Sequence, residues 1–438
     1  MPLVIVLIGI ICLLLLTVVL KLNPFISFII ICLGVGIGSG LEVQETVQSI
    51  QTGIGNTLGY LVMILGLGAM LGKLVADGGA AQRITEKLVQ TFGLKNVQWA
   101  VVLAGFIVGI PMFYTVGFVI LIPLVYTIAA STGLPLIYVG LPMLSALSVT
   151  HGFLPPHPAP TAIAQMFNAN IGQTILYGIL IAIPTIILAG PLFARTIKKV
   201  KGMPLKAFHN PKILQDHEMP GFGISLFTAL LPVLLIVCAT LSAYFLPEDL
   251  IVRKVLTFVG DPSVAMLLSV LVAIYTLGIA QGNNMTALMQ SITQGVTSIT
   301  MILLIIGGAG AFKQILIDTG AGDYIAAQMV SLNVSPLVLG WLIAAFIRVC
   351  VGSATVAGMT ASGIIFPFVE NSGVQPELMV IAIGAGSLML SHVNDGGFWL
   401  FKEYFNLTIK ETLSTWTVME TIVGVMGLIG VLVLNAII

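Results

Sequence analysis

Long apolar runs that are almost free of charge constrain this chain more than any other feature. Eight of these runs approach or reach the length of about 20 residues that a helix needs to cross a bilayer. They are residues 3–20, 24–40, 58–76, 173–196, 224–246, 262–280, 297–317 and 415–437. Only 8% of the 438 residues are charged and 58% are hydrophobic, which excludes both a soluble globule and a disordered chain. The sequence therefore predicts an all-α polytopic protein whose surroundings are the lipid bilayer.

Charge, cysteine content and the N-terminus exclude several other classes. The 17 basic residues balance the 17 acidic ones, so no nucleic-acid partner is indicated. The four cysteines lie in apolar runs without a CxxC pair, so neither a disulfide framework nor a metal cluster is expected. The N-terminal run lacks a basic start and a small-residue cleavage site, and we interpret it as a retained span. No P-loop is visible, which excludes a self-contained ATP-driven pump.

The two halves of the chain repeat each other. Equivalent residues are Gln48 and Gln290, Asp77 and Asp318, Gly79 and Gly320, Trp99 and Trp341, Gly109 and Gly352, Pro123 and Pro367, Thr150 and Ser391, and Phe167 and Phe405. Every offset lies between 238 and 244 residues, and the order is kept. The sequence therefore predicts an internal repeat, with residues 1–197 as repeat one and 223–438 as repeat two. Residues 198–222, the long polar segment between them, form the linker.

The distribution of basic residues predicts how the repeats are oriented. Loop 77–97 and the central linker with its flank are rich in lysine and arginine, which places both in the cytoplasm and both termini in the periplasm. Loop 318–336, the equivalent of loop 77–97, carries Asp318 and Asp323 and no basic residue. Equivalent loops with opposite bias indicate two repeats of inverted topology.

Two apolar stretches, 97–170 and 336–408, are interrupted by Gly, Pro, Ser, Thr and His. Each is long enough for three straight crossings, but the polar interruptions favour a re-entrant hairpin followed by a broken helix. The predicted hairpin tips are 109–117 and 351–358, and the predicted breaks are 150–160 and 391–397. Four prolines exclude a continuous helix through the first break. Non-helical backbone at membrane depth must be buried or line a cavity, so the four elements are expected to meet at one site.

The remaining segments complete the predicted architecture. Residues 1–96 and 223–317 supply scaffold helices, and 173–197 and 415–438 form the last helix of each repeat. The total is about ten full crossings, with two re-entrant hairpins and two broken helices.

Four long strings carry a resemblance to a known family. They are FYTVGFVILIPLVYTIAAS at 113–131, SVTHGFLPPHPAPTAIA at 148–164, GSATVAGMTASG at 352–363 and SHVNDGGFWLFKEYFNLT at 391–408. Over essentially its whole length the chain resembles the gluconate permease family of bacterial inner-membrane proton symporters, within the ion transporter superfamily. The resemblance implies a scaffold and a transport domain, elevator-type movement, a homodimer, and a proton as coupling ion with no cofactor. Family members commonly carry glutamate where this chain has Thr115, proline for Gly396 and glycine for Ala159.

A sugar acid needs many neutral hydrogen-bonding groups and one group for its carboxylate. The predicted substrate-binding residues supply such groups at the tips and breaks; they are Thr115, Thr150, His151, Ser353, Thr355, Ser391, His392 and Asn394. The hairpin tips also direct helix N-termini inward, where their dipoles attract anions.

Three residues are candidates for proton coupling. Asp395 is a carboxylate in an intramembrane break, which costs a few kcal/mol unless it is paired or hydrated. His151 and His392 occupy equivalent breaks, and histidine titrates near neutral pH. Structural roles stay open for two residues. Asp395 has a potential ion-pair partner in Lys402. His157 suits either a substrate site or the structure of the helix break. Arg348 either attracts the anion or extends to the interface.

These features predict a secondary active transporter that imports gluconate or a close sugar acid by proton symport. The same mechanism with idonate or D-serine is the nearest alternative. An intramembrane enzyme and a passive channel are more distant ones. The chain contains no HExxH helix and no recognised nucleophile–base motif, and a two-fold repeat suits alternating access, so an enzyme is not expected.

Overall fold

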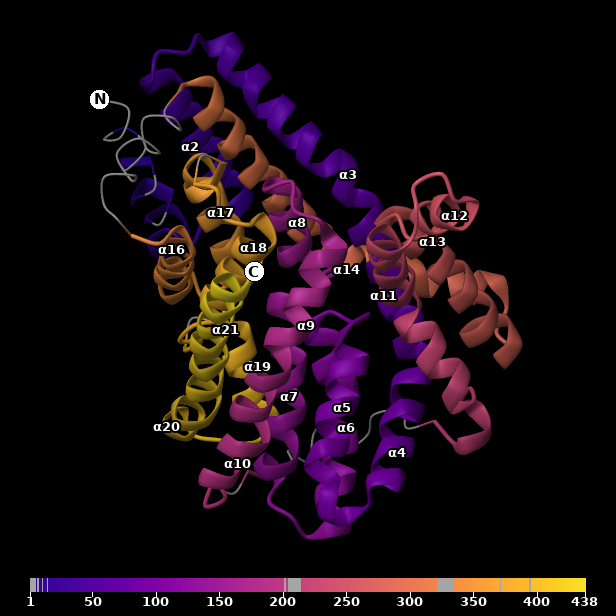
Figure 1. Ribbon diagram of the computed structural model, residues 1–438. Helices are drawn as coiled ribbons and strands as arrows, with labels where there is room; N and C mark the ends of the chain where they lie inside the picture. The colour runs from indigo at the N-terminus through magenta and orange to yellow at the C-terminus, as the bar shows by residue number, and fades with distance from the viewer. Residues whose placement is uncertain are drawn as a thin grey trace.

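The computed structural model describes residues 5, 8–9, 11–13, 15–200, 202–203, 214–320, 334–370, 372–393 and 395–438. Every secondary-structure element in these residues is helical (Figure 1), which confirms the predicted all-α class. Six helices within this part are long and apolar enough to cross a membrane, or up to eight if two bent pairs each form one span. The predicted ten crossings remain a prediction, and much of the first span lies outside the described residues.

Two exceptionally long helices pack together as an antiparallel pair, α3 (Val43–Asp77) and α14 (Met285–Asp318). The Ser49 hydroxyl donates to Asp318 Oδ2 at 2.5 Å, and the Ser291 hydroxyl donates to Asp77 Oδ2 at 2.6 Å. Each bond therefore joins the start of one helix to the end of the other. Ser49 matches Ser291 in the predicted repeat and Asp77 matches Asp318, so the two bonds are reciprocal.

Glycines let the two backbones approach closely. A Cβ atom on Gly53 would lie 2.5 Å from the carbonyl oxygen of Gly310, and one on Gly295 would lie 2.7 Å from that of Ala69. Small residues at such crossings are how helices associate in lipid, where burial from water gives no driving force. Both helices begin well before the apolar runs of the sequence, because their polar first turns bond to the partner helix.

Two helical hairpins turn where the sequence predicted tips. The first joins α5 (Val97–Gly109) to α6 (Tyr114–Thr132), and the second joins α16 (Pro336–Val351) to α17 (Ala354–Glu370). Gly352 ends α16 with φ of 77°, a left-handed conformation that only glycine adopts without strain. The tips are thus short, and they leave the ends of four helices close to one another.

Two further helices are broken. The first break separates α7 (Leu136–Phe153) from α8 (Pro158–Met166), and the second separates α18 (Pro376–Gly386) from α19 (Gly396–Tyr404). Almost every residue of α7 and α18 is buried, and so are residues 154–157 of the first break. The second break is partly exposed, since Leu390 and Val393 are on the surface. The second break starts earlier than predicted, because α18 ends before Ser391. Asn168 and Asn406, which are equivalent in the predicted repeat, both adopt positive φ just after α8 and α19.

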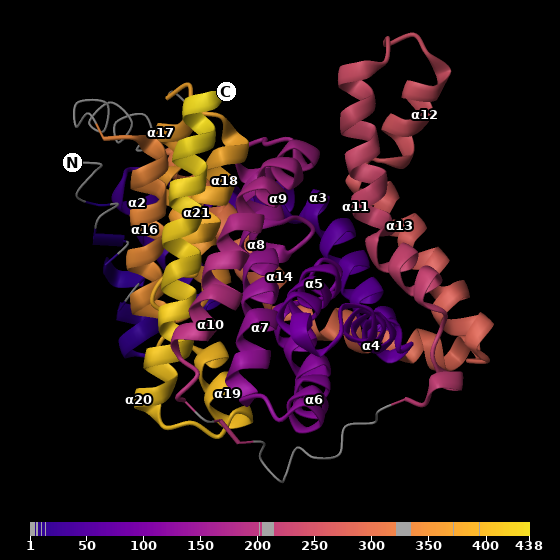
Figure 2. The ribbon, with the colours of Figure 1, turned by 60° about the horizontal axis from the view of Figure 1, so that its bottom comes forward.

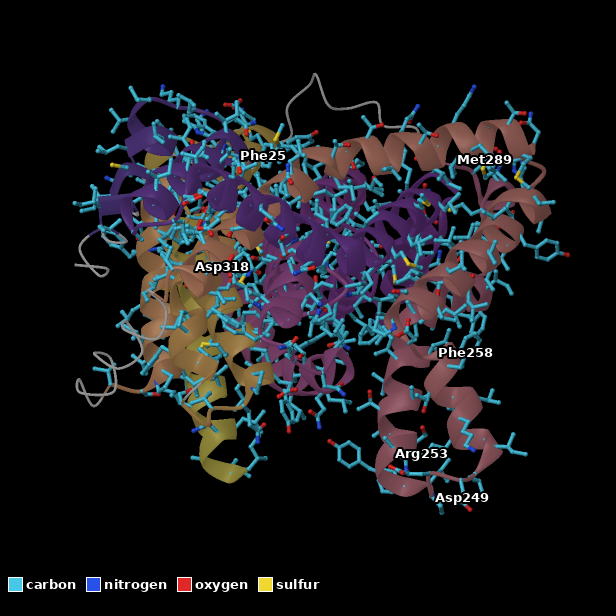
Figure 3. The ribbon with its side chains drawn as sticks, turned by 90° about the horizontal axis from the view of Figure 1, so that it is seen from above. Phe25, Asp249, Arg253, Phe258, Met289 and Asp318 are labelled. Carbon is cyan, nitrogen blue, oxygen red and sulfur yellow. The ribbon has the colours of Figure 1, made fainter. Side chains whose placement is uncertain are left out.

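The other helices surround this centre (Figure 2). They are α2 (Pro24–Gly38), α9 (Ile171–Ile187), α10 (Phe193–Thr196), α11 (Phe222–Phe245), α12 (Ile251–Val259), α13 (Pro262–Ala273), α20 (Ile409–Thr412) and α21 (Val418–Ile437). Helices α11 to α13 form an arm that stands away from α16, α18 and α21. Seen from above, Asp249, Arg253 and Phe258 lie near the end of this arm, far from Asp318 (Figure 3). Phe258 is 66% exposed, as expected for a surface that lipid covers.

The segment predicted as loop 77–97 is mostly helix, α4 (Ala80–Phe92). The sequence alternates polar and apolar residues at helical spacing there, and the buried face of α4 packs on α5. The described end of the linker is tied to this helix. Gln82 exchanges two hydrogen bonds with the Leu214 backbone at 2.9 and 3.1 Å, and Arg83 binds Asp216. This end of the linker therefore lies against α4.

The close approach of α3 and α14 predicts a difference between two glycines of α3. Gly53→Ala places a methyl group against the backbone of α14 and should destabilise the protein by about 1–3 kcal/mol. Gly55→Ala is the matched control, because nothing lies within 4 Å of its added Cβ. Alanine there should be neutral or slightly stabilising. Thermal unfolding in detergent measures both, and equal melting temperatures for the two variants would contradict the packing described.

Candidate substrate site

A cavity of about 510 Å³ lies where the two hairpin tips meet the two broken helices. The first tip contributes Phe113, Tyr114 and Thr115, and the second contributes the segment from Val351 to Thr355. The remaining lining includes Ser148 and His151 of α7, Arg348 of α16, Asp395 to Gly397 of the second break, and Trp416 and Glu420 of the last span. Segments from both halves of the chain thus line one space that holds Arg348, Asp395 and Glu420, and the predicted tips and breaks contribute to it.

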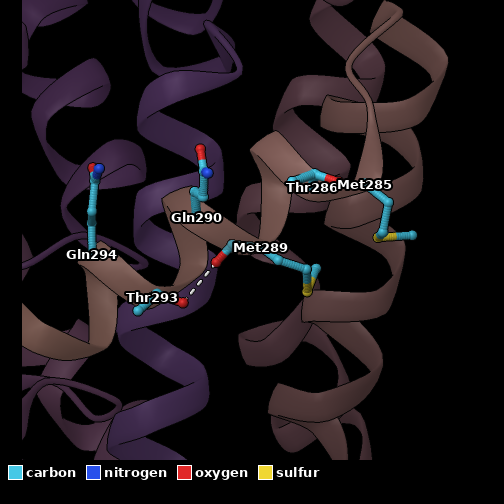
Figure 4. Close-up of a pocket in the computed structure, with 6 residues that line it drawn as sticks. All are labelled: Met285, Thr286, Met289, Gln290, Thr293 and Gln294. Atoms are coloured by element: carbon cyan, nitrogen blue, oxygen red, sulfur yellow. Dashed lines mark hydrogen bonds between the residues drawn. The ribbon is translucent and has the colours of Figure 1, made fainter.

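A second hollow of about 560 Å³ has a different character (Figure 4). All of its lining residues belong to the first turns of α14, and they include Met285, Met289 and Gln290. The Thr293 hydroxyl there donates to the carbonyl oxygen of Met289 within the same helix at 2.8 Å. This hollow presents no charged group, so the cavity between the tips is the candidate site.

Arg348 and Asp395 form a buried ion pair in the wall of the cavity. Arg348 Nη2 donates to Asp395 Oδ2 at 2.5 Å, and its Nη1 donates to the carbonyl oxygen of Gly352. Asp395 caps α19 by accepting from the Gly397 amide at 2.9 Å, and it also accepts from the Ser391 hydroxyl. Such charge-assisted hydrogen bonds are among the strong ones in proteins. The pair therefore fastens the second hairpin tip to the second break.

Ser391 connects this ion pair to the last span. Its hydroxyl accepts from Trp416 Nε1 at 2.7 Å, and its carbonyl oxygen accepts from the Thr417 hydroxyl at 2.5 Å. Trp416 and Thr417 belong to a π-helical turn, η8 (Leu413–Thr417), which precedes α21. The wider turn directs both side chains toward the second break.

Histidines satisfy backbone carbonyls at the hairpin ends. His157 Nε2 donates to the carbonyl oxygen of Gly109 at 2.7 Å, and His392 Nε2 donates to that of Val349 at 3.0 Å. Carbonyls in the last turn of a helix lack partners within the helix, so each histidine joins a break to the hairpin arm of its own repeat. His151 differs, because its Nδ1 atom has no hydrogen-bond partner among the described residues and its ring faces the cavity.

Glu420 lies on α21 and is 1% exposed. Neither of its carboxyl oxygens has a hydrogen-bond partner in the described part of the chain. The Ser148 hydroxyl interacts with it, but outside hydrogen-bond geometry. A buried carboxylate without hydrogen bonds is costly, so this group requires a proton, a ligand or a rearranged neighbour.

The structure brings together some of the predicted residues and not others. Thr115, His151, Ser353, Thr355 and Asp395 line the cavity. The others that can be placed lie behind its wall. They are Thr150, Ser391 and His392. The Thr150 hydroxyl donates to the carbonyl oxygen of Leu147, and the bonds of Ser391 and His392 are those given above. Asn394 lies outside the described residues. The partner of Asp395 is Arg348, whereas Lys402 pairs with Glu403 at 2.7 Å. Arg348 is 3% exposed, so it does not extend to an interface.

Glu420, Trp416 and Tyr114 were not among the predicted site residues. Glu420 had a clear signal, because it is the only charged residue in the apolar run 415–437. An ionisable residue inside a membrane span is by default a functional candidate. The aromatic residues gave no such signal, since aromatic side chains are common in any apolar helix.

Helices of membrane-spanning length around a central polar cavity with broken helices define a membrane transporter. A family model described as "GntP family permease" matches residues 1–437, and the chain belongs to this family. It is therefore a permease and not an enzyme.

Characterised relatives match the chain from end to end. The high-affinity gluconate transporter of Escherichia coli K12 is 52% identical over 438 residues, covering 100% of both chains. The Gnt-II system L-idonate transporter of the same organism is 51% identical, again over 100% of both chains. A gluconate permease of Bacillus subtilis is 48% identical over 448 residues.

Two transporters of solved structure share the fold. The YdaH transporter of Alcanivorax borkumensis superposes with a TM-score of 0.66 at 18% identity, over 94% of this chain and 97% of that one. MtrF of Neisseria gonorrhoeae gives 0.64 at 16% identity, over 94% of both chains.

The ion pair predicts coupled effects on stability. Arg348→Gln and Asp395→Asn should each destabilise the protein by about 3 kcal/mol, because each leaves the other charge buried and unpaired. The double variant removes both charges and should lose less than the sum. Melting temperatures in detergent measure the coupling, and strictly additive losses would argue against it. Arg253→Gln is the control, because its partner Glu248 is exposed and such pairs contribute about 0–1 kcal/mol.

Proposed function

We propose that the protein is a secondary active transporter that imports gluconate or a closely related sugar acid together with a proton. The observation that carries this proposal is the cavity between the two hairpin tips, which combines an arginine with several hydroxyl groups. The 52% identity to a gluconate transporter and the 51% identity to an L-idonate transporter support this class of substrate. L-Idonate is therefore the first alternative substrate, and D-serine is the second.

The chemistry of the cavity suits a polyhydroxy acid. Arg348 is the cationic group for the carboxylate, and its Nε atom has no hydrogen-bond partner among the described residues. Thr115, Ser353 and Thr355 offer hydroxyl groups from the two tips. Ser353 and Thr355 lie at the start of α17, where the helix dipole also favours an anion. The volume of about 510 Å³ is in the range of small-molecule sites.

The proposed mechanism is elevator-type alternating access between two repeats of inverted topology. The reciprocal bonds of α3 and α14, the matched positive φ of Asn168 and Asn406, and the paired hairpins and breaks support the repeat. In this proposal α3 and α14 belong to the scaffold, and the hairpins and broken helices carry the substrate. The basic residues of 77–97 and of the linker place these segments in the cytoplasm of a bacterial inner-membrane protein, with both termini periplasmic. A homodimer completes the proposal.

Asp395, His151 and His392 are proposed to belong to the network of residues that couples the proton to the substrate. Asp395 and His151 line the cavity directly. His392 acts from behind the wall, through the Val349 carbonyl in the same turn as Arg348. No cofactor is part of this proposal, and the coupling ion is the proton.

Uptake into proteoliposomes tests the function. Labelled gluconate should accumulate above equilibrium when an inward proton gradient is imposed, and the accumulation should collapse when an ionophore dissipates the gradient. A competition panel of gluconate, L-idonate and D-serine then ranks the substrates. Equilibration without accumulation would indicate a passive pathway, and no uptake of any of the three would contradict the substrate class.

Thr115 allows a test of charge in the cavity. Thr115→Glu adds a carboxylate to the wall of the cavity and should change the pH dependence of gluconate uptake, because that carboxylate ionises as the pH rises. Thr115→Val is the control, because it removes the hydroxyl without adding charge. Uptake between pH 5.5 and 8.5 compares the variants, and an unchanged pH profile in Thr115→Glu would show that position 115 does not face the substrate.

A further inference from the structure

The charges of three residues in the cavity wall do not sum to zero when both carboxyl groups are ionised. Arg348 contributes one positive charge, and Asp395 and Glu420 contribute two carboxyl groups. Asp395 holds Arg348 through a direct ion pair, and it receives further bonds from Ser391 and Gly397. Glu420 has no comparable bond in the described structure. One carboxyl group is thus held by an arginine and two hydrogen-bond donors, and the other has none of these partners among the described residues.

The neighbours of Glu420 within the described part of the chain give it no second cation. The groups that face it are Tyr114 of α6, His151 of α7, Arg348 of α16 and Asp395 ahead of α19. Arg348 is already paired with Asp395, and the Tyr114 hydroxyl has no described hydrogen-bond partner. Of the other packed helices, α18 carries one charged residue, Glu377, which accepts from the Asn170 amide at 2.8 Å.

The sum of these three charges affects how well the cavity binds an anionic substrate. With Glu420 ionised and His151 neutral, the three charges sum to one net negative charge, which opposes the entry of a carboxylate. With Glu420 protonated, the sum is zero and Arg348 is available to a second anion. In a site of low dielectric constant the difference of one charge is large at these short separations. Protonation of Glu420 is therefore a condition for tight binding of an anion beside Arg348.

We propose that Glu420 carries the transported proton, and that its protonation admits the anionic substrate to Arg348. This inference rests on the proposed function and names the group that performs the coupling. The proton adds to a Glu420 carboxyl oxygen from the outer side before or with the substrate. It leaves the same oxygen toward the cytoplasm when the substrate departs. Asp395 serves the coupling by keeping Arg348 in place.

Glu420→Gln tests the proposal because it mimics the protonated state permanently. The variant should still exchange labelled gluconate for unlabelled gluconate across proteoliposomes, but it should lose accumulation driven by a proton gradient. Its gluconate affinity should not vary with pH. In the unmodified protein the affinity should fall by about tenfold per pH unit once Glu420 is ionised.

Glu411→Gln is the matched control on the same span. Glu411 is partly exposed and accepts from the Thr408 hydroxyl through its carboxyl group, and glutamine retains an acceptor oxygen for that bond. This variant should accumulate gluconate as the unmodified protein does. Proton-driven accumulation by Glu420→Gln at the level of this control would overturn the inference. The absence of both exchange and accumulation in the unmodified protein would instead refute the proposed function.

A measurement on the unmodified protein covers the case in which Glu420→Gln fails to fold. Infrared difference spectra record the carbonyl band of protonated carboxyl groups when gluconate is added. The proposal expects a new band that shifts when the protein is labelled with ¹³C-glutamate. A band that shifts only with ¹³C-aspartate, or no new band, would overturn the assignment to Glu420.

Discussion

Backbone that leaves helical geometry inside a membrane must find hydrogen-bond partners within the protein, and this requirement organises the centre of the molecule. The breaks after α7 and α18 are tolerated because side chains complete the missing bonds. His157 and His392 reach carbonyls at the hairpin ends, and Thr417 reaches the carbonyl of Ser391. The same bonds hold tips and breaks together, so the features that permit non-helical backbone also enclose a polar cavity.

The charged network depends on this enclosure. Arg348 lies in the last turn of α16 and Asp395 caps the start of α19, so each charge has the sign that its helix end favours. The pair is nevertheless expensive to desolvate, and it is stable only because Gly352, Ser391 and Gly397 satisfy the remaining bonds. Glu420 departs from this pattern most clearly, because neither of its carboxyl oxygens has a hydrogen-bond partner among the described residues. A buried group that the stability of the fold does not explain is expected to have a functional role.

Much of this arrangement could be predicted from the sequence. Prolines, glycines and paired polar residues in apolar stretches predicted both tips and both breaks, because such residues interrupt helices for steric reasons. The extra length of α3 and α14 could not be predicted, since their polar turns depend on partners from a distant segment. Asp395 was identified, but its partner was not. Sequence spacing suggested Lys402, whereas the fold places Arg348 there from 47 residues away.

The antiparallel pair of α3 and α14 differs in charge between its two ends. Asp77 is joined by Lys73 at 2.9 Å, and Asp318 is joined by Gln314 at the same distance. If the two ends were equivalent, the pair would not influence its own orientation in the bilayer during synthesis. Lys73 lies beside Asp77 and on the same side as the basic residues of α4, whereas Glu45 lies near Asp318 at the other end. Positive charge near the end of a span influences the orientation in which the span is inserted. Lys73 therefore contributes to the orientation of α3, which is determined before α14 has been synthesised.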